Sequence, residues 1–348
     1  MHYLDHNASS PLRPEARAAM ERALDACGNP FSVHGAGRAA RRIVESAREQ
    51  VAAFAGARPE EVIFTSGGTE ANALALRGAI EGAAEAGERI TRLFVSAIEH
   101  PSVLATVAHL AEHAPGLRVE TIPVNKDGVA DLGATTLREG KGRALVAMMA
   151  ANNETGAIQP TDGIDTLLFV DAVQRPGRYG NASYVSLSAH KLGGPQGAGA
   201  LIVRDGAPFA APRAGTPNVA AIAGFGAVAH RARIDSTLRD RFEAGLPSRA
   251  VVFGAGVARL PNTSNFALPG IAAETALMAL DLDGVMVSSG AACSSGNVKP
   301  SHVLKAMGVS DDLARCALRA SFGWNSTVAD VDAALASIGR LVARREAA

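Results

Sequence analysis

Short apolar runs alternate with segments of helical periodicity over the first two thirds of the chain. Seven of these runs predict buried strands, at residues 62–65, 93–98, 119–124, 144–150, 167–170, 183–187 and 197–203. The segments between them predict helices at 14–24, 39–54, 70–87, from 101 onward, at 132–137 and from 219 to about 232. Strands that alternate with helices are typical of a mostly parallel sheet with helices on both faces.

The sequence changes character near Asp235, where a second, smaller domain is expected to begin. Its predicted strands lie at 251–253, 263–267, 285–288 and 316–322, and its predicted helices at 273–280, 303–307 and 328–342. We therefore expect an N-terminal segment that packs with the small domain (1–15), a large domain (16–234) and a small C-terminal domain (235–348).

Polar side chains follow several predicted strands at the point where each strand ends. His100, Asn153, Asp171 and Lys191 each lie at or just past such an end. Because ligands gather outside the carboxyl ends of parallel strands, these residues are expected near one site. Lys191 precedes a glycine-rich turn in a chain that takes most of its positive charge from arginine. A lysine there indicates chemistry that needs an amine, such as an imine with a carbonyl cofactor, which a guanidinium cannot form.

Two motifs allow both a structural and a functional interpretation. Residues 66–70, Ser-Gly-Gly-Thr-Glu, separate a strand from a helix. They form either an ordinary glycine turn or a phosphate cradle of free amide groups and the Thr69 hydroxyl, and their spacing does not indicate a nucleotide. Asp171 ends a buried strand, where it is either a helix N-cap or the counter-ion of a protonated ring nitrogen.

One of the three cysteines differs from the others in its surroundings. Cys293 stands in the middle of residues 288–297, which carry no large side chain and so cannot anchor in a core. We expect a mobile loop with an exposed, reactive thiol. Cys27 and Cys316, at a helix end and on a strand, are expected to be inert. An odd number of thiols in a long chain indicates a reducing compartment.

Composition excludes several classes of function. Lysine plus arginine and aspartate plus glutamate both number 34, so there is no basic surface for nucleic acid and no polybasic arm for anionic membranes. The N-terminus lacks the pattern of a signal peptide, and no apolar run approaches the roughly 20 residues of a spanning helix. These features predict a cytoplasmic enzyme.

Two further catalytic patterns occur in the sequence and are disfavoured. Residues 109–113, His-Leu-Ala-Glu-His, fit the H-x-x-E-H pattern of some metalloproteases, but no third ligand follows at a convincing place, so an exposed amphipathic helix is favoured. Ser188, His190 and Asp171 are the residue types of a hydrolase triad, but the chain has no G-x-S-x-G sequence.

Six motifs, in order along nearly the whole chain, resemble one known family. They are Tyr3-Leu4-Asp5-His6-Asn7-Ala8, Phe64-Thr65-Ser66-Gly67-Gly68-Thr69-Glu70-Ala71-Asn72, Asn152-Asn153-Glu154-Thr155-Gly156, Asp171-Ala172-Val173-Gln174, Ser188-Ala189-His190-Lys191 and Ser288-Ser289-Gly290-Ala291-Ala292-Cys293. Together they resemble the pyridoxal-phosphate-dependent cysteine desulfurases of the class V aminotransferase superfamily. The short loop that leads into Lys299-Pro300-Ser301-His302-Val303-Leu304 is similar to the branch that serves nitrogenase and housekeeping iron–sulfur assembly.

The resemblance implies a fold. It is the α/β fold-type I of pyridoxal-phosphate-dependent transferases, with a large domain whose mostly parallel seven-stranded sheet is flanked by helices, and a smaller α+β C-terminal domain.

The resemblance also implies roles for individual residues. Lys191 would hold pyridoxal 5'-phosphate as an imine and move protons, Asp171 would pair with the ring nitrogen, and His100 would stack on the ring as a catalytic residue. Gln174 would contact the ring hydroxyl. The remaining cofactor contacts, mostly to the phosphate, are implied for Gly68, Thr69, Ser188, His190 and, from a neighbouring subunit, Thr216. Substrate contacts are implied for Asn153 and Arg319, which match the family's carboxylate ligands, and for Asn7.

The activity follows from the same resemblance. Cys293 would attack the sulfur of bound L-cysteine, release L-alanine and keep the sulfur as a persulfide. The sulfur would pass to an acceptor or an iron–sulfur scaffold protein. The resemblance implies a homodimer without a resident metal, in which Cys293 is at most a transient ligand of an iron–sulfur cluster.

The chain departs from the family pattern in three places. Residues 159–167 are too few for the usual helix, residues 208–213 lack a glycine-rich, charged loop, and residues 245–256 are trimmed. Two alternatives therefore stay open: another enzyme of the superfamily, such as a selenocysteine lyase or an aminotransferase, or a non-catalytic scaffold of a sulfur-transfer complex. Trp324 stands where a charged or small residue is more usual, and the sequence offers no reason for it.

Overall fold

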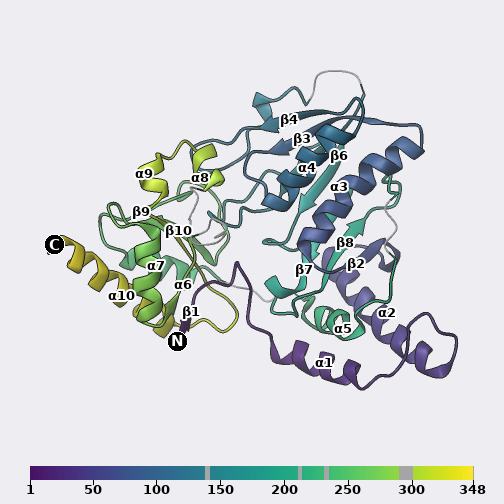
Figure 1. The fold of residues 1–348 in the computed structure, drawn as a ribbon, viewed down its shortest axis with the longest axis horizontal. Helices are drawn as coiled ribbons and strands as arrows, with labels where there is room; N and C mark the ends of the chain where they lie inside the picture. Colours follow the sequence, from purple (N-terminus) through teal and green to yellow (C-terminus); the bar gives the residue numbers. More distant parts are fainter. Residues whose placement is uncertain (138–141, 211–213, 231–234, 290–300, 348) are drawn as a thin grey trace.

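The structure, a computed structural model, describes residues 1–137, 142–210, 214–230, 235–289 and 301–347. Figure 1 shows one lobe built around a large sheet and a second lobe, formed by the green and yellow C-terminal part of the chain, beside it. The expected α/β fold, with a large mostly parallel sheet flanked by helices, is confirmed.

The large sheet has seven strands. In spatial order they are β2 (Val62–Thr65), β8 (Gly199–Val203), β7 (Tyr184–Ser188), β6 (Leu167–Asp171), β5 (Arg143–Met149), β3 (Ile90–Ser96) and β4 (Arg118–Ile122). β8 runs antiparallel to both of its neighbours, and the other neighbouring pairs are parallel. The other six strands therefore end at one edge of the sheet, and that edge carries the polar residues predicted to form the site.

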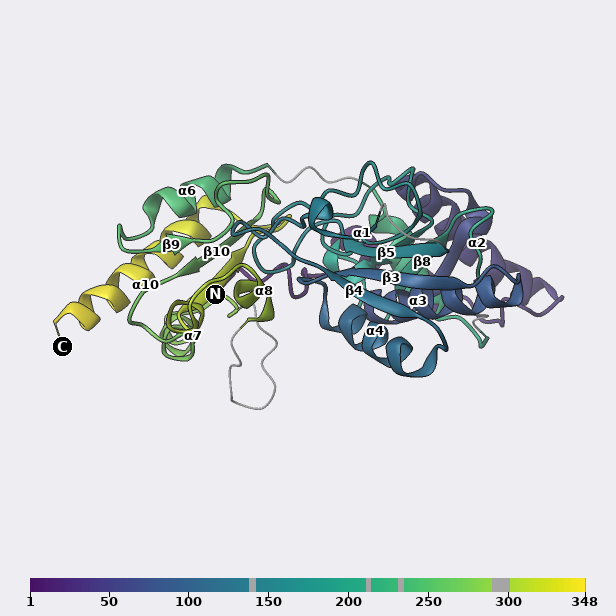
Figure 2. The ribbon, with the colours of Figure 1, turned by 90° about the horizontal axis from the view of Figure 1, so that it is seen from above.

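Helices cover both faces of this sheet (Figure 2). α3 (Gly68–Glu85) and α4 (Pro101–His113) pack on one face, α2 (Gly35–Ala55) and α5 (Val219–Val228) on the other, and α1 (Pro14–Leu24) packs against α5. Successive residues of each strand face opposite sides, so that Phe169 belongs to the core under α3 and α4 while Val170 belongs to the core under α2 and α5. Burial on both faces explains why the strands are continuous apolar runs.

Two helix predictions in this lobe differ from the structure. The helix predicted at 132–137 is wrong: the chain makes a single 3-10 turn at Leu132–Ala134, where the Asp131 carboxylate accepts the amide hydrogen of Gly133 at 3.0 Å. Such a local bond offers the backbone an alternative to a helix. The helix expected to reach residue 232 ends at Val228, and residues 231–234 lie outside the described part of the chain.

The segment 159–167 carries no helix, in keeping with its short length. Within residues 142–210, β5 connects to β6 without any helix. The segment leads into the start of β6, which lies at the opposite edge of the sheet from the strand ends.

The C-terminal lobe contains two small sheets and five helices within its described residues. One sheet has the antiparallel order β12 (Ala317–Ser321), β10 (Thr263–Ala267), β9 (Val251–Val252), and in the other β1 (His2–Tyr3) pairs in parallel with β11 (Val285–Met286). The helices are α6 (Thr237–Gly245), α7 (Ala273–Leu282), α8 (His302–Ala306), α9 (Asp311–Ala314) and α10 (Val328–Glu346). The sequence predicted neither α6 nor α9. Within the described ranges, no helix combines the length and apolar composition needed to cross a membrane.

The N-terminal segment joins the two lobes. Leu4 is 0% exposed and packs with Phe266 and Phe322 in the core of the C-terminal lobe. Further along, the amide of Ser10 donates to the carbonyl of His190 at 2.8 Å. Trp324 now has a structural reason, because its indole Nε1 donates to the carbonyl of Pro11 at 3.0 Å and its ring lies under the guanidinium of Arg13, 5.2 Å away. The domain boundaries at 15 and 234 stay predictions.

Because Leu4 is the fully buried anchor of this segment, we predict that Leu4→Ala lowers the free energy of unfolding by about 2–5 kcal/mol. Urea denaturation measures the change. Leu282→Ala is the matched control, since Leu282 in the same lobe is 88% exposed, and its effect should stay within about 0.5 kcal/mol. Equal losses in the two variants would contradict the anchoring role.

Candidate active site

A cavity of about 660 Å³ lies at the edge where the six strands end. It brings together most of the residues predicted to form the site, from both lobes: Asn7, Gly68, Thr69, His100, Asn153, Asp171, Gln174, Ser188, His190, Lys191 and Arg319. Thr216 is exposed and is not among the lining residues. Cys293 lies outside the described residues.

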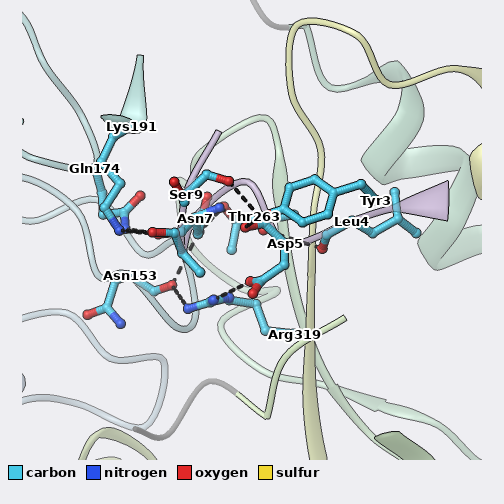
Figure 3. Close-up of polar contacts among 12 residues, drawn as sticks. Tyr3, Leu4, Asp5, Asn7, Ser9, Asn153, Gln174, Lys191, Thr263 and Arg319 are labelled. Carbon is cyan, nitrogen blue, oxygen red and sulfur yellow. Dashed lines mark hydrogen bonds and ion pairs between the residues drawn. The ribbon is translucent and has the colours of Figure 1, made fainter. Parts of the chain in front are cut away.

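Lys191 points into this cavity from a 3-10 turn, Ala189–Lys191, that follows β7 directly. Its Nζ donates to the backbone carbonyls of Asn7 and, at 3.0 Å, Ala8 (Figure 3). Burial, with the nearby positive charge of Arg319, lowers the pKa of Lys191 to about 8, against the opposing effect of Asp171 and Asp5. Part of the amine is therefore uncharged near neutral pH, which is the form that attacks a carbonyl.

Asn7 links the segments that surround Lys191. Its carbonyl also accepts a hydrogen bond from Nε2 of Gln174 at 2.9 Å, and its own Nδ2 donates to the carbonyl of Asn153 at 3.2 Å and to Oγ1 of Thr263 at 2.9 Å. The Asn7 amide nitrogen is thus engaged in holding protein segments together. Its expected contact with substrate stays a prediction.

Arg319 enters the cavity from β12, and two contacts, one at each terminal nitrogen, hold its guanidinium. Nη2 forms an ion pair with Oδ1 of Asp5 at 2.6 Å, and Nη1 donates to the carbonyl of Asn153 at 2.9 Å (Figure 3). The buried Nε has no partner among the described residues. A guanidinium held in this way is oriented for a planar carboxylate. The sequence included Asp5 in a motif but did not predict its pairing with Arg319.

Asp171 ends β6 as an acceptor of two hydrogen bonds. Oδ2 accepts from Nδ2 of Asn72 at 2.7 Å, and Oδ1 accepts from the amide of Val173 at 3.0 Å. No α-helix follows Asp171 within residues 142–210, so the N-cap interpretation is wrong. A buried carboxylate with these donors remains available as a counter-ion.

A second buried carboxyl, Glu99, lies near Asp171 and was not predicted. Its Oε1 accepts the amide hydrogen of Met149 at 2.6 Å, and its Oε2 has no partner among the described residues. Burial, together with the negative charge of Asp171, raises the pKa of Glu99 well above its usual range. The raised pKa favours the neutral form of the Glu99 carboxyl, which limits the negative charge beside Asp171.

His100 caps the N-terminus of α4 and lines the cavity. Burial lowers its pKa, and the nearby Lys191 and His302 act in the same direction, against Asp171. The ring is therefore neutral at physiological pH. Its stacking on a cofactor stays a prediction.

One end of the cavity carries donors suited to a phosphate group. α3 begins at Gly68, shortly after the end of β2, and a Cβ at Gly68 would lie 2.6 Å from the Val173 side chain, so any larger residue would force Val173 to shift. Ser188 Oγ is buried and has no partner among the described residues. The free amides of a helix start and an unpartnered hydroxyl fit the anionic end of a phosphorylated carbonyl cofactor whose aldehyde reaches Lys191.

The two disfavoured catalytic patterns are not supported by the described residues. His190 Nδ1 lies 3.2 Å from Oγ of Ser9 and makes no hydrogen bond with Ser188, so these residues form no hydrolase triad. His109 and His113 are exposed, with ring centroids 4.2 Å apart. Among the described residues, no group of three side chains is arranged to hold a metal ion.

Comparison with known proteins gives the family. The aminotransferase class-V family matches residues 2–212 and 207–334. The cysteine desulfurase of Cereibacter sphaeroides is 41% identical over 363 aligned residues, which cover 95% of this chain and 92% of the relative. A solved NifS-like protein has a TM-score of 0.88 at 31% identity and covers 99% of this chain and 100% of its own. The solved structure described as SspA in complex with cysteine has a TM-score of 0.80 at 27% identity, covering 94% and 100%. The chain therefore belongs to the class-V aminotransferases and, within them, to the cysteine desulfurase family.

Proposed function

We propose that this protein is a pyridoxal-phosphate-dependent cysteine desulfurase that converts L-cysteine to L-alanine and keeps the sulfur as a persulfide on Cys293. The observation that carries the proposal is the arrangement of Lys191, Asp171 and Arg319 around one cavity. An amine of lowered pKa, a buried carboxylate and a fixed guanidinium serve the carbonyl, the ring nitrogen and the substrate carboxylate respectively. Membership of the family supports the reaction class, and the SspA relative is described as a complex with cysteine.

The cofactor assignment rests on the donors around the cavity. Bound pyridoxal phosphate supplies an electron sink for bond breaking at the substrate carbons. Lys191 would hold it covalently, Asp171 would keep the proton on its ring nitrogen, and Gln174 would contact its ring hydroxyl. The phosphate would lie at the α3 start, near Gly68, Thr69, Ser188 and His190, with Thr216 contributed by a second subunit of a homodimer.

The substrate would be oriented by its carboxylate. Arg319 would bind that carboxylate together with Asn153, while Asp5 keeps the guanidinium in place. Lys191 Nζ, once free, would move the proton at the substrate α carbon. A carboxylate-specific contact at this position favours amino acids as substrates.

The transfer of sulfur from cysteine to Cys293 needs no external oxidant or reductant. The Cys293 thiolate attacks the substrate sulfur, an S–S bond forms, the Cβ–S bond breaks, and the carbon takes the electron pair and a proton to give the methyl group of alanine. Cys293 lies outside the described residues, so this assignment rests on its place in the sequence. The persulfide would then pass to an acceptor protein, in the cytoplasm as the sequence predicts.

We expect the wild-type protein to produce alanine from cysteine, and sulfide in the presence of a thiol reductant. Lys191→Ala and Cys293→Ala should each lower alanine formation at least about 100-fold, because each removes a covalent participant. Cys27→Ala is the matched control for Cys293, since Cys27 is an exposed free cysteine that does not line the cavity, and its rate should be unchanged.

Other outcomes of this experiment have defined meanings. Full activity in Cys293→Ala would instead indicate a superfamily enzyme that does not need a sulfur-accepting cysteine. No alanine and no cofactor absorbance in the wild type would indicate a scaffold protein.

The lowered pKa of Lys191 predicts how fast the cofactor-free protein takes up pyridoxal phosphate. Only the uncharged amine reacts, so the rate should rise about tenfold per pH unit below pH 8 and level off above about 8, where the amine has lost its proton. Stopped-flow absorbance of the bound cofactor measures the rate.

The variant Arg319→Gln tests whether the charge of Arg319 helps to lower the pKa of Lys191. The positive charge of Arg319 lowers the pKa of Lys191, so its removal should move the midpoint of the pH profile upward. A profile without a midpoint, or the same midpoint in both proteins, would contradict the electrostatic explanation.

A further inference from the structure

Asn72 lies between Asp171 and the start of α4 and is 1% exposed. Its Nδ2 donates one hydrogen to Oδ2 of Asp171 at 2.7 Å and the other to Oγ of Ser102 at 3.0 Å. A carboxylate can only accept hydrogen bonds, so the nitrogen of the Asn72 amide, not its oxygen, must face Asp171. The carboxylate therefore fixes the orientation of the Asn72 side chain.

Ser102 passes this orientation on to His100. Its Oγ accepts a hydrogen from Asn72, which leaves its single hydroxyl hydrogen for Nδ1 of His100, 2.7 Å away. The backbone amide of Ser102 donates to the same Nδ1 at 3.2 Å. A backbone N–H cannot accept a hydrogen bond, so Nδ1 of His100 must carry a lone pair. The proton of the neutral ring then resides on Nε2.

We propose that Asn72 and Ser102 are positioning residues that hold His100 in its Nε2–H tautomer, so that the ring presents a proton donor to the cavity. Asn72 comes from α3, Ser102 from α4 and Asp171 from β6, so a chain of hydrogen bonds through three separate elements ends at one ring nitrogen. The chemical role of this donor rests on the proposed function. The tautomer itself does not, because it follows from hydrogen bonds within the protein.

In this tautomer, His100 can donate a proton to a bound substrate but cannot first accept one. Its Nε2 has no hydrogen-bond partner among the described residues, and the ring lines the cavity that holds Lys191 and Arg319. An Nε2–H group can donate to a lone pair of a bound substrate, but it cannot accept a proton before it has given one. His100 thus enters the reaction as an acid, and Lys191 remains the group that accepts protons.

The tautomer is measurable by nitrogen NMR on the full-length, cofactor-bound protein labelled with ¹⁵N-histidine, without cysteine. The chain has 9 histidines, and the His100 signals are those lost in His100→Gln. We expect a pyridine-type resonance for Nδ1 and a pyrrole-type resonance for Nε2. A protonated Nδ1, in either the other neutral tautomer or the imidazolium, would overturn the proposal.

Three variants test the roles of the two positioning residues. Asn72→Ala frees the Ser102 hydroxyl to rotate and to accept a hydrogen from Nδ1 in competition with the backbone donor, so the two His100 nitrogen resonances should move toward each other as the second tautomer becomes populated. Ser102→Ala, which keeps the backbone donor, should shift Nδ1 alone. Thr106→Val is the control on the same helix: Thr106 Oγ1 donates to the carbonyl of Ser102 at 2.8 Å and does not contact His100, so the spectrum should not change. An unchanged His100 spectrum in whichever of Asn72→Ala and Ser102→Ala folds would refute the positioning role, so the test remains decisive even if one variant folds poorly.

Steady-state kinetics separate this role from simple structural support. Asn72→Ala should lower kcat about tenfold while the KM for cysteine changes less than about twofold, since Asn72 orients an acid and does not bind the carboxylate. Thr106→Val should match the wild type in both constants. If the wild type forms no alanine at all, the proposed function fails while the NMR result still decides the tautomer. A KM effect without a kcat effect would contradict the positioning role.

Discussion

The active site depends on holding two basic side chains, Lys191 and Arg319, in one cavity while their positive charges are stabilised to different extents. Arg319 has a carboxylate of its own, Asp5, and so remains a full charge for an anionic substrate group. Among the described residues, the Lys191 amine hydrogen-bonds only to the backbone carbonyls of Asn7 and Ala8, which stabilise its charge less than an ion pair would. Burial and the repulsion from Arg319 then make its amine easy to deprotonate. The same short stretch, residues 5–8, thus determines which cation stays charged and which becomes a nucleophile.

The negative charge in the site is limited by the different surroundings of two buried carboxyl groups, Asp171 and Glu99. Asp171 has two hydrogen-bond donors, whereas Glu99 has one, and burial beside Asp171 raises the pKa of Glu99 and so favours its neutral form. A second ionised carboxyl would compete with Asp171 for a cationic ring nitrogen. Asn72 could not stabilise a second negative charge there, because it already donates both hydrogens of its side-chain amide, to Asp171 and to Ser102.

Much of the fold and most of the site follow from local sequence. Buried strands in a sheet covered on both faces are continuous apolar runs, and the residues just after them, such as Asp171 and Lys191, necessarily meet at one edge. The errors come from weaker local signals. The Asp131 carboxylate accepts the amide hydrogen of Gly133, and one turn replaces the expected helix. The short helices α6 and α9 have too few turns for a clear period. The roles of Asp5, Asn72 and Ser102 depend on contacts with residues far away in the chain. The spacing of residues along the sequence does not predict such contacts.

The N-terminal segment has a consequence for how the protein is made. Asp5 and Arg319 are 314 residues apart in the chain, and the amide of Asn7 donates to the hydroxyl of Ser321 across the same separation. The large sheet is complete once β8 has left the ribosome, but Asp5 and Asn7 meet these two partners only after β12 has emerged. Until then, the segment whose carbonyls accept the hydrogen bonds of Lys191 lacks its contacts to β12. A nascent chain can fold its large sheet early, yet the site around Lys191 is complete only when β12 has brought Arg319 into place.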